Sequence, residues 1–253
     1  MRRTRICILA VTAALAALAG LPSAAPAATA PMTSQLDVGA QLLRQPVGRP
    51  WSIALLLGAA FAMPDGSPVS PVKNMVIRFP HATLNDGRFS TCSAAHLTAL
   101  GPNGCAAGSK IGTGTAVADA RPLVPFAIPA DLTVFNGPKI GRARHLSILV
   151  ITRKLDITLV LDGVLRRARG RYGFALTLPV PRLPTLTGAR DAGIASFQVK
   201  IKAFRRGISY IEAPRSCPSG GLPFDGLFSF ADGTSAHQAS AISCTLMGGP
   251  STP

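Results

Sequence analysis

Apolar and polar side chains alternate along much of this chain, and this period of two most restricts what it can fold into. Residues 75–79, 172–178 and 197–203 each place apolar side chains at every second position. Successive side chains of a strand point to opposite faces, so the pattern predicts sheets with one buried and one wet face. Helical surfaces usually use many glutamates, yet the chain contains only Glu212. We therefore expect an all-β fold, an antiparallel β-sandwich.

Turn signals rich in Asn, Asp and Gly separate these runs at the short spacing that is typical of a sandwich. Residues 227–231 and 236–245 flank one such signal at 232–234 and are expected to form a hairpin. No low-complexity linker interrupts the sequence. Residues 28–253 are therefore predicted to form a single domain, with a weak possible subdivision near 136–142.

The N-terminus has the pattern of a secretory signal peptide over residues 1–27. Three arginines precede an apolar run at 6–21, and Ala25-Pro26-Ala27 offers a small-residue cleavage site. An uncleaved anchor is the alternative, but the run is short for a membrane span. No later apolar run reaches spanning length, so we expect a mature chain without a transmembrane segment. The expected location is extracellular, either free or associated with the cell surface.

Four cysteines remain once the predicted signal peptide is removed, and an even number in an exported chain indicates two disulfides. Four cysteines allow three pairings. We favour Cys92 with Cys105 and Cys217 with Cys244, because each pair brackets a compact segment rich in turn residues. Closing loops of this size contributes about 3 kcal/mol in chain-entropy models. A short helix is expected near residues 93–100, inside the first cysteine loop.

The segment GCAAGSKIGTGTAVADA at residues 104–120 resembles nucleotide-binding loops in part. A phosphate-binding loop requires its lysine directly after the last glycine and a helix beyond it, whereas Lys110 follows Ser109 and the chain leads on to Pro122 and Pro125 instead of a helix. We interpret residues 111–117 as a strand with one face of small residues. A neighbouring segment or an aromatic ring should lie close over Gly112 and Gly114.

Several short motifs occur in a fixed succession along the mature chain. They are FP-x-x-x-x-N from Phe79, FSTC, a second cysteine before GSKIGTGTA, then TVFNG, GRYGFALTLPVP, CP-x-GG and F-x-F-ADGT before the last cysteine. This succession resembles a family of uncharacterised secreted proteins from GC-rich actinobacteria. The resemblance implies an exported, disulfide-bonded β protein, and it assigns no activity to any residue.

Positive charge is concentrated in one part of the chain. Residues 139–206 carry 15 basic and 3 acidic residues, and the rest of the mature chain is neutral in sum. Arg166, Arg167, Arg169 and Arg171 are expected at a hairpin tip, where guanidinium groups could bind phosphates or carboxylates of an envelope polymer. A solvated loop is the alternative. Nucleic acid is not expected as a partner, since an exported chain without a reading module gives no reason for it.

Catalytic and metal-binding motifs do not appear in the sequence. There is no G-x-S-x-G, H-E-x-x-H or C-x-x-C motif, and the four histidines are scattered. Asp86 near His81 is the nearest approach to a catalytic pair. We therefore predict no metal, no cofactor and a non-enzymatic structural or binding role at the cell envelope. The alternatives are a secreted hydrolase with an unrecognised site and a carrier that holds an apolar ligand between the sheets.

Overall fold

A computed structural model gives the structure of the protein and describes residues 32–44, 50–152, 155–183, 185, 190–214 and 217–243. The predicted signal peptide lies outside the described residues and stays a prediction. Within the described ranges, no helix is both long and apolar enough to cross a membrane.

Strands make up most of the described chain. The strands are β1 (Thr33–Arg44), β2 (Trp51–Ala62), β3 (Val72–Pro80), β4 (Thr83–Leu84), β5 (Lys110–Asp119), β6 (Ile128–Ile140), β7 (Ala143–Thr152), β8 (Ile157–Arg167), β9 (Tyr172–Pro179), β10 (Gly193–Ile201), β11 (Phe204–Arg205), β12 (Ile208–Ser209), β13 (Ile211–Ala213), β14 (Leu222–Phe230) and β15 (Ser235–Ile242). The helical segments are α1 (Ala94–Leu100) and the 3-10 turns η1 (Asp86–Arg88), η2 (Pro102–Gly104) and η3 (Ala107–Ser109). The predicted all-β class with one short α-helix is therefore confirmed.

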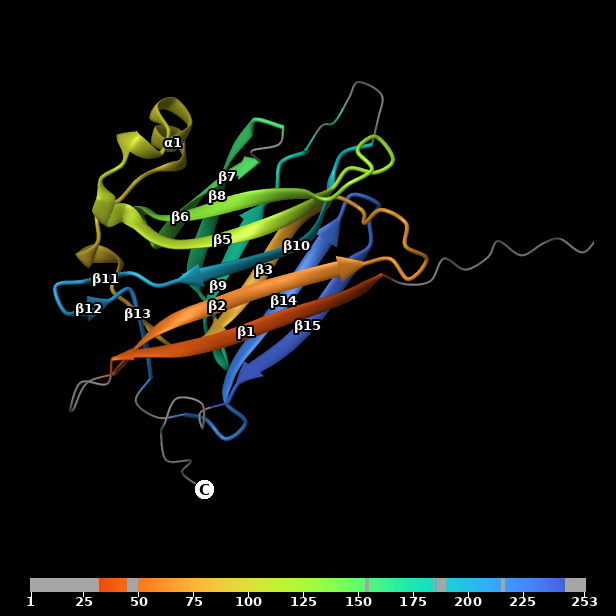
Figure 1. Cartoon of the computed structure of the whole chain (residues 1–253). Coiled ribbons are helices and arrows are strands. Elements are labelled where there is room, and N and C mark those ends of the chain that lie inside the picture. The colour runs from red at the N-terminus through yellow and green to blue at the C-terminus, as the bar shows by residue number, and fades with distance from the viewer. Residues whose placement is uncertain are drawn as a thin grey trace, which may run out of the picture.

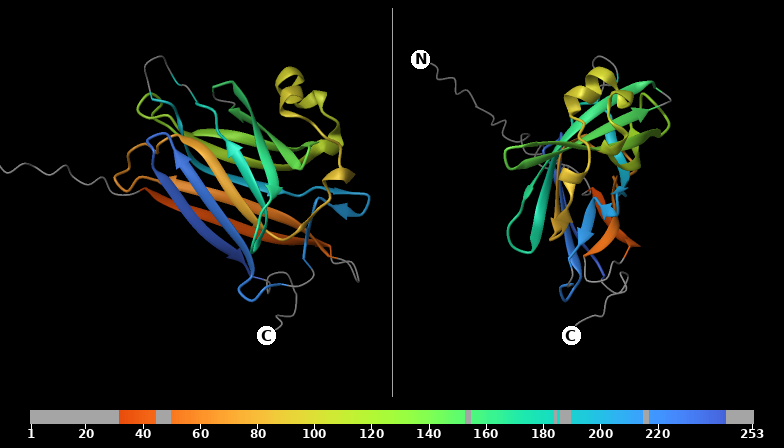
Figure 2. Two further views of the ribbon diagram at one scale, coloured as in Figure 1. Left: turned by 180° about the vertical axis from the view of Figure 1, so that it is seen from behind. Right: turned by 90° about the vertical axis from the view of Figure 1, so that its left-hand side faces the viewer.

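Thirteen strands form one antiparallel sheet in the order β15-β14-β3-β9-β8-β7-β6-β5-β10-β2-β13-β4, with β1 on the other edge of β2. This sheet folds back on itself, so that β1, β2, β10 and β5 cross in front of β3 and β9 (Figure 1). Figure 2 shows the two layers from behind and edge-on. The end strands β1 and β15 come together, where Gln238 Nε2 donates a hydrogen bond of 3.0 Å to Ser34 Oγ. The result is a sandwich, as predicted, made from a single folded sheet.

The inner faces of the two layers form the main hydrophobic core. On β2 every second side chain points inward, from Ile53 through Leu55, Leu57 and Ala59 to Phe61. Apolar side chains of β3 and β14 in the opposite layer pack against them. Burial of alternate side chains on both layers is what holds the strands in register, because a slip of one residue would turn the apolar set outward.

The glycine-rich segment that resembles a nucleotide loop is strand β5, as expected. A Cβ atom at Gly112 would lie 2.7 Å from the carbonyl oxygen of Lys200, and one at Gly114 would lie 2.1 Å from that of Gln198. Both oxygens belong to β10, which pairs with β5. Gly112 and Gly114 therefore allow the backbone of β10 to approach β5 closely. Larger side chains at these two positions would force the two strands apart.

The predicted disulfide between Cys92 and Cys105 is present and encloses α1. The Ser93 side chain caps this helix by accepting a hydrogen bond from the His96 backbone N–H at 3.1 Å. Leu97 anchors the helix in a small core with Phe135 of β6. The disulfide loop thus covers the outer face of the sheet.

The structure describes only one of the two cysteines of the second predicted disulfide. Cys217 is disulfide-bonded, but Cys244 lies outside the described residues. The pairing of these two cysteines therefore stays a prediction.

Candidate functional site

The four arginines singled out in the sequence lie together at the turn between β8 and β9, as predicted. Arg166 and Arg167 end β8, and Arg169 and Arg171 stand in the turn, which closes through a hydrogen bond of 3.1 Å from Ala168 N to the Gly173 carbonyl oxygen. All four side chains are exposed, and none makes an ion pair with a described residue. We call residues 166–171 the arginine tip.

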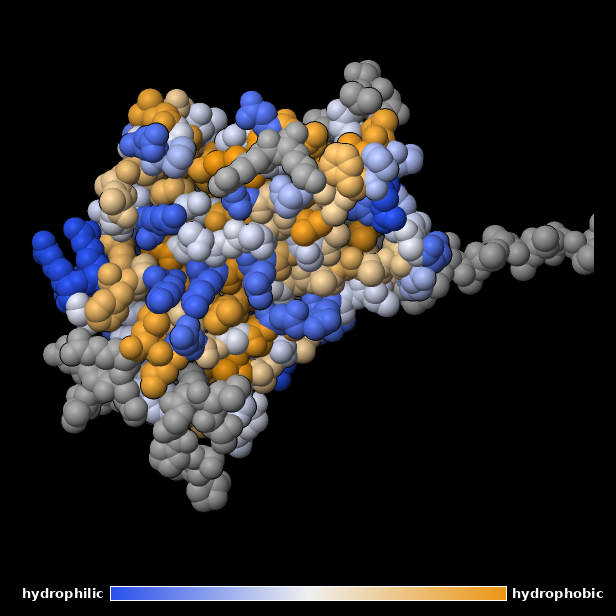
Figure 3. All heavy atoms as spheres, viewed as in Figure 1, coloured by the Kyte–Doolittle hydropathy of each residue, from blue (hydrophilic) through white to orange (hydrophobic). Residues whose placement is uncertain are grey.

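Further basic side chains lie at the same end of the sandwich as the arginine tip, because several strands begin or end there. Arg144 of β7 is paired in register with Leu165 of β8, which places the β6–β7 turn beside the tip. The turn between β11 and β12 also ends in basic side chains, and hydrophilic groups project there in Figure 3. We define the basic end by these described residues: Arg88, Lys110, Lys139, Arg142, Arg144, the four arginines of the tip, Lys202, Arg205 and Arg206.

Acidic residues at the basic end are few. Asp86 accepts a hydrogen bond from Arg144 Nε at 2.8 Å, so one guanidinium is neutralised there, and Glu212 lies on β13.

Sequence reasoning found the arginine tip because its residues are adjacent in the chain. It did not single out Arg88 or Lys110, because only the strand pairing brings them to the same end.

The opposite end of the sandwich has a different electrostatic character. Arg121 donates to Asp119 through Nη2 at 2.7 Å, and Arg182 donates to Asp191 through Nε at 2.7 Å. The pKa of Asp119 lies below its ordinary value, chiefly through its hydrogen bond with Arg121. Arg121 and Arg182 are thus each matched by a carboxylate of the same chain.

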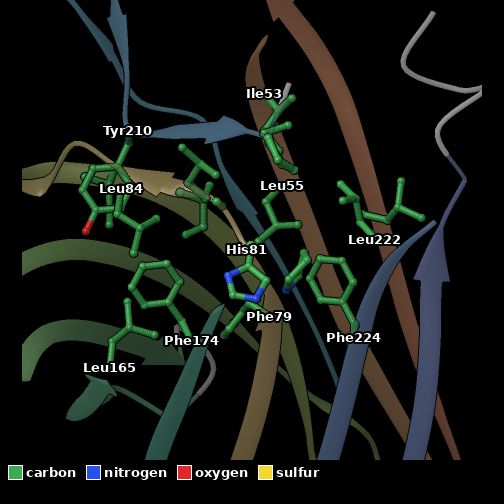
Figure 4. Close-up of a pocket in the computed structure, with 18 of the residues that line it drawn as sticks. Ile53, Leu55, Phe79, His81, Leu84, Leu165, Phe174, Tyr210, Leu222 and Phe224 are labelled. Carbon is green, nitrogen blue, oxygen red and sulfur yellow. The ribbon is translucent and has the colours of Figure 1, made fainter. Parts of the chain in front are cut away.

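An apolar cavity of about 80 Å³ lies between the layers at the basic end (Figure 4). Its walls come from both layers and from the short strands that close this end of the sandwich. The lining residues are Ile53, Leu55, Phe79, Pro80, His81, Ala82, Leu84, Ile111, Leu146, Leu165, Phe174, Ile201, Tyr210, Ile211, Ala213, Pro214, Leu222, Phe224 and Ile242.

The mouth of the cavity lies beside the arginine tip. His81 is exposed, whereas the other lining residues that the structure describes are buried or half-buried. Its Nε2 lies 3.2 Å from the carbonyl oxygen of Gly170, in the middle of the tip. The guanidinium carbons of Arg167 and Arg144 lie 4.7 and 5.7 Å from the ring centroid of Phe174, which lines the cavity. Two cations therefore stand directly at the apolar wall.

The hydroxyl of Tyr210 does not make the cavity polar. It donates a hydrogen bond of 3.0 Å to Asn136 Oδ1, and the amide nitrogen of Asn136 in turn donates to backbone carbonyls of Asp86 and Ser90 at 3.1 Å each. Burial, together with the negative charge of Asp86, raises the pKa of Tyr210 well above its ordinary value. Tyr210 therefore presents a ring to the cavity and stays neutral.

The structure does not join Asp86 and His81 into a catalytic pair. Asp86 binds Arg144, and His81 contacts Gly170. Two other histidines do meet carboxylates: His145 Nδ1 lies 3.0 Å from Asp162, and His237 shares Asp225 with Arg78. The residues in these last two contacts, unlike His81, do not line the cavity. They tie neighbouring strands together.

The described residues contain no group of three or more His, Cys, Asp or Glu side chains placed to hold a metal ion. Compared with known proteins, the chain matches no family model, no curated protein and no solved structure. The resemblance to secreted actinobacterial proteins therefore stays a prediction. The basic end and the cavity beneath it are the candidate site on the basis of their own chemistry.

Proposed function

We propose that the protein is an exported, non-enzymatic binding protein that attaches to anionic polymers of the cell envelope through its basic end. The exposed, unpaired arginine tip is the observation that carries this proposal. Guanidinium groups bind phosphate and carboxylate oxygens through two parallel hydrogen bonds, and several on one surface suit a repeating polyanion. Membership in the secreted actinobacterial family belongs to the same proposal.

The contrast between the two ends supports attachment at one of them. Arg121 and Arg182 are occupied by carboxylates of the same chain, so a polyanion there would have to displace an internal partner. Arg169 and Arg171 carry no such partner among the described residues. Attachment through the basic end should be screened by salt, because these charges are exposed to solvent.

Two triple variants with the same loss of charge test this proposal. Arg166, Arg169 and Arg171 are replaced by Gln in the first; Lys73, Arg182 and Arg190, at the opposite end, are replaced by Gln in the second. Binding of each mature protein to purified cell walls is measured by co-sedimentation over a range of salt concentrations. The first variant should bind about tenfold or more weakly, because it loses several charge-assisted contacts. The second should bind as the wild type does.

Two results would overturn the proposal. Equal losses in the two variants would show that retention follows net charge rather than the arginine tip. Unchanged retention of the first variant, or no salt-sensitive retention of the wild type, would exclude the tip as an attachment surface.

A further inference from the structure

We infer that the cavity at the basic end binds the alkyl chain of a single-chain amphiphilic anion, whose head group is held at the mouth by Arg144 and Arg167. Fatty carboxylates and alkyl phosphates share this chemistry. The inference does not rest on polymer attachment, because it concerns Arg144 and Arg167 against the ring of Phe174, whereas the polymer test replaces Arg166, Arg169 and Arg171.

The lining selects an apolar occupant. Aliphatic and aromatic side chains make up nearly all of it, and the hydroxyl of Tyr210 is already engaged with Asn136. A buried water needs two to four polar partners, which these walls do not supply, whereas apolar cavities stay dry and accept apolar molecules. A hydrocarbon chain would fill the space without leaving a polar group unpaired.

The volume limits the occupant to one narrow chain. At about 80 Å³ the cavity is roughly half the size of the ~150 Å³ cavity that accepts benzene. It therefore suits the end of one alkyl chain, and a fused-ring or two-chain lipid would not fit. The remainder of the ligand has to emerge at the mouth, beside His81.

The mouth selects a negative head group. Phe174 forms part of the cavity wall, and the guanidinium groups of Arg167 and Arg144 both lie against its ring. A negative head group on a chain that emerges beside Phe174 would meet these cations. Arg144 is partly neutralised by Asp86, which leaves Arg167 as the stronger partner. A cationic head group would be repelled at the same position.

Calorimetric titration of the wild-type mature chain with decanoate and with decyltrimethylammonium, both below their micelle concentrations, tests the charge preference. Decanoate should bind saturably and about tenfold or more tightly than the cation. Arg167→Gln should weaken decanoate binding about tenfold, the loss expected for one charge-assisted contact. Arg169→Gln, in the same turn but without a contact to Phe174, is the matched control and should change the affinity less than about twofold.

Methyl NMR of the wild type, with labelled isoleucines, locates the chain without any substitution in the core. Decanoate should shift the signals of Ile53, Ile111 and Ile242, which line the cavity, and leave those of Ile128 and Ile194 near the opposite end unchanged. Absence of saturable binding, equal affinity for the two amphiphiles, or shifts away from the cavity would each overturn the inference. An equal effect of Arg167→Gln and Arg169→Gln would exclude the proposed head-group contact.

Discussion

The two ends of the sandwich interior use the same kinds of side chain and pack them differently. At the end opposite the basic end, which we call the filled end, the ring of Phe61 meets those of Phe228 and Phe230 edge-on, with centroids 4.8 and 5.5 Å apart. At the basic end, Phe79 and Phe224 also meet edge-on, at 5.8 Å, yet about 80 Å³ beside them is unfilled. Aromatic content therefore does not by itself determine how completely a core is packed.

The difference has an energetic meaning. An unfilled volume of this size costs about 2 kcal/mol, at roughly 24 cal/mol per Å³ of cavity. A domain is stable by only about 5–15 kcal/mol, so the loss is appreciable. The filled end is fully packed, whereas the cavity at the basic end lowers the free energy of unfolding. The basic end also holds cations without an ion-pair partner among the described residues. Features that reduce stability often accompany binding sites, which is why we place the site there.

The largest effect is expected from truncating an aromatic side chain at the filled end. Phe228 is fully buried and contacts Phe61, so Phe228→Ala should lower the free energy of unfolding by about 3–5 kcal/mol. Phe224→Ala is the matched control: its ring already borders empty space and has fewer contacts to lose, so its cost should be smaller by about 1 kcal/mol or more. Urea denaturation of both variants measures the difference. Equal losses would contradict the contrast between the two ends.

A smaller effect is expected when an alanine is enlarged at each end. Ala59 points into the filled core and Ala213 lines the cavity, and both are almost fully buried. Ala59→Leu should destabilise the protein by about 1–3 kcal/mol through overpacking. Ala213→Leu has space for its added atoms and should cost less than about 1 kcal/mol or increase stability. Thermal and urea unfolding compare the two, and a greater loss for Ala213→Leu would show that the cavity wall cannot accept more volume.

The smallest effect concerns the ion pair between Asp119 and Arg121 at the filled end. Removing it by Asp119→Asn should cost about 0.2–1 kcal/mol at pH 7, since Arg121 is half-exposed. The pKa of Asp119 lies below its ordinary value in the folded state, so its contribution is present above pH 3.8 and is lost as the pH falls through the lower, folded pKa. Urea titrations should therefore show wild type and variant converging as the pH falls below 3.8. A gap that widens on acidification would contradict this sign.

Strand positions that alternate apolar and polar side chains were predictable from the sequence. The runs at 75–79 and 172–178 lie within β3 and β9, and the hairpin around 232–234 joins β14 to β15. Strand β2, with the sequence WSIALLLGAAFA, gave no such signal, because small or apolar residues occupy both of its faces and hide the period of two. The short helix between Cys92 and Cys105 was predicted because its signals are local.

The candidate site also has one part that the sequence predicted and one part that it did not. The arginine tip was visible because Arg166 to Arg171 are neighbours in the chain. A cavity between the sheets belonged only to one of the two alternatives, the carrier, and none of its walls could be named in advance. Leu55, Leu165 and Leu222 are far apart in sequence, and their convergence depends on how the sheet folds back on itself.

The sequence alone determined the local features: extended strands, tight turns, a capped helix in a disulfide loop and a basic hairpin tip. Each depends on residues a few positions apart, whose periodicity, turn chemistry and charge act before any long-range contact forms. Tertiary structure alone decided that the glycines of β5 face the backbone of β10, that one end is filled and the other hollow, and that two arginines lie against the cavity wall. These outcomes follow from strand order and from how side chains of distant segments fit together, which no local pattern specifies.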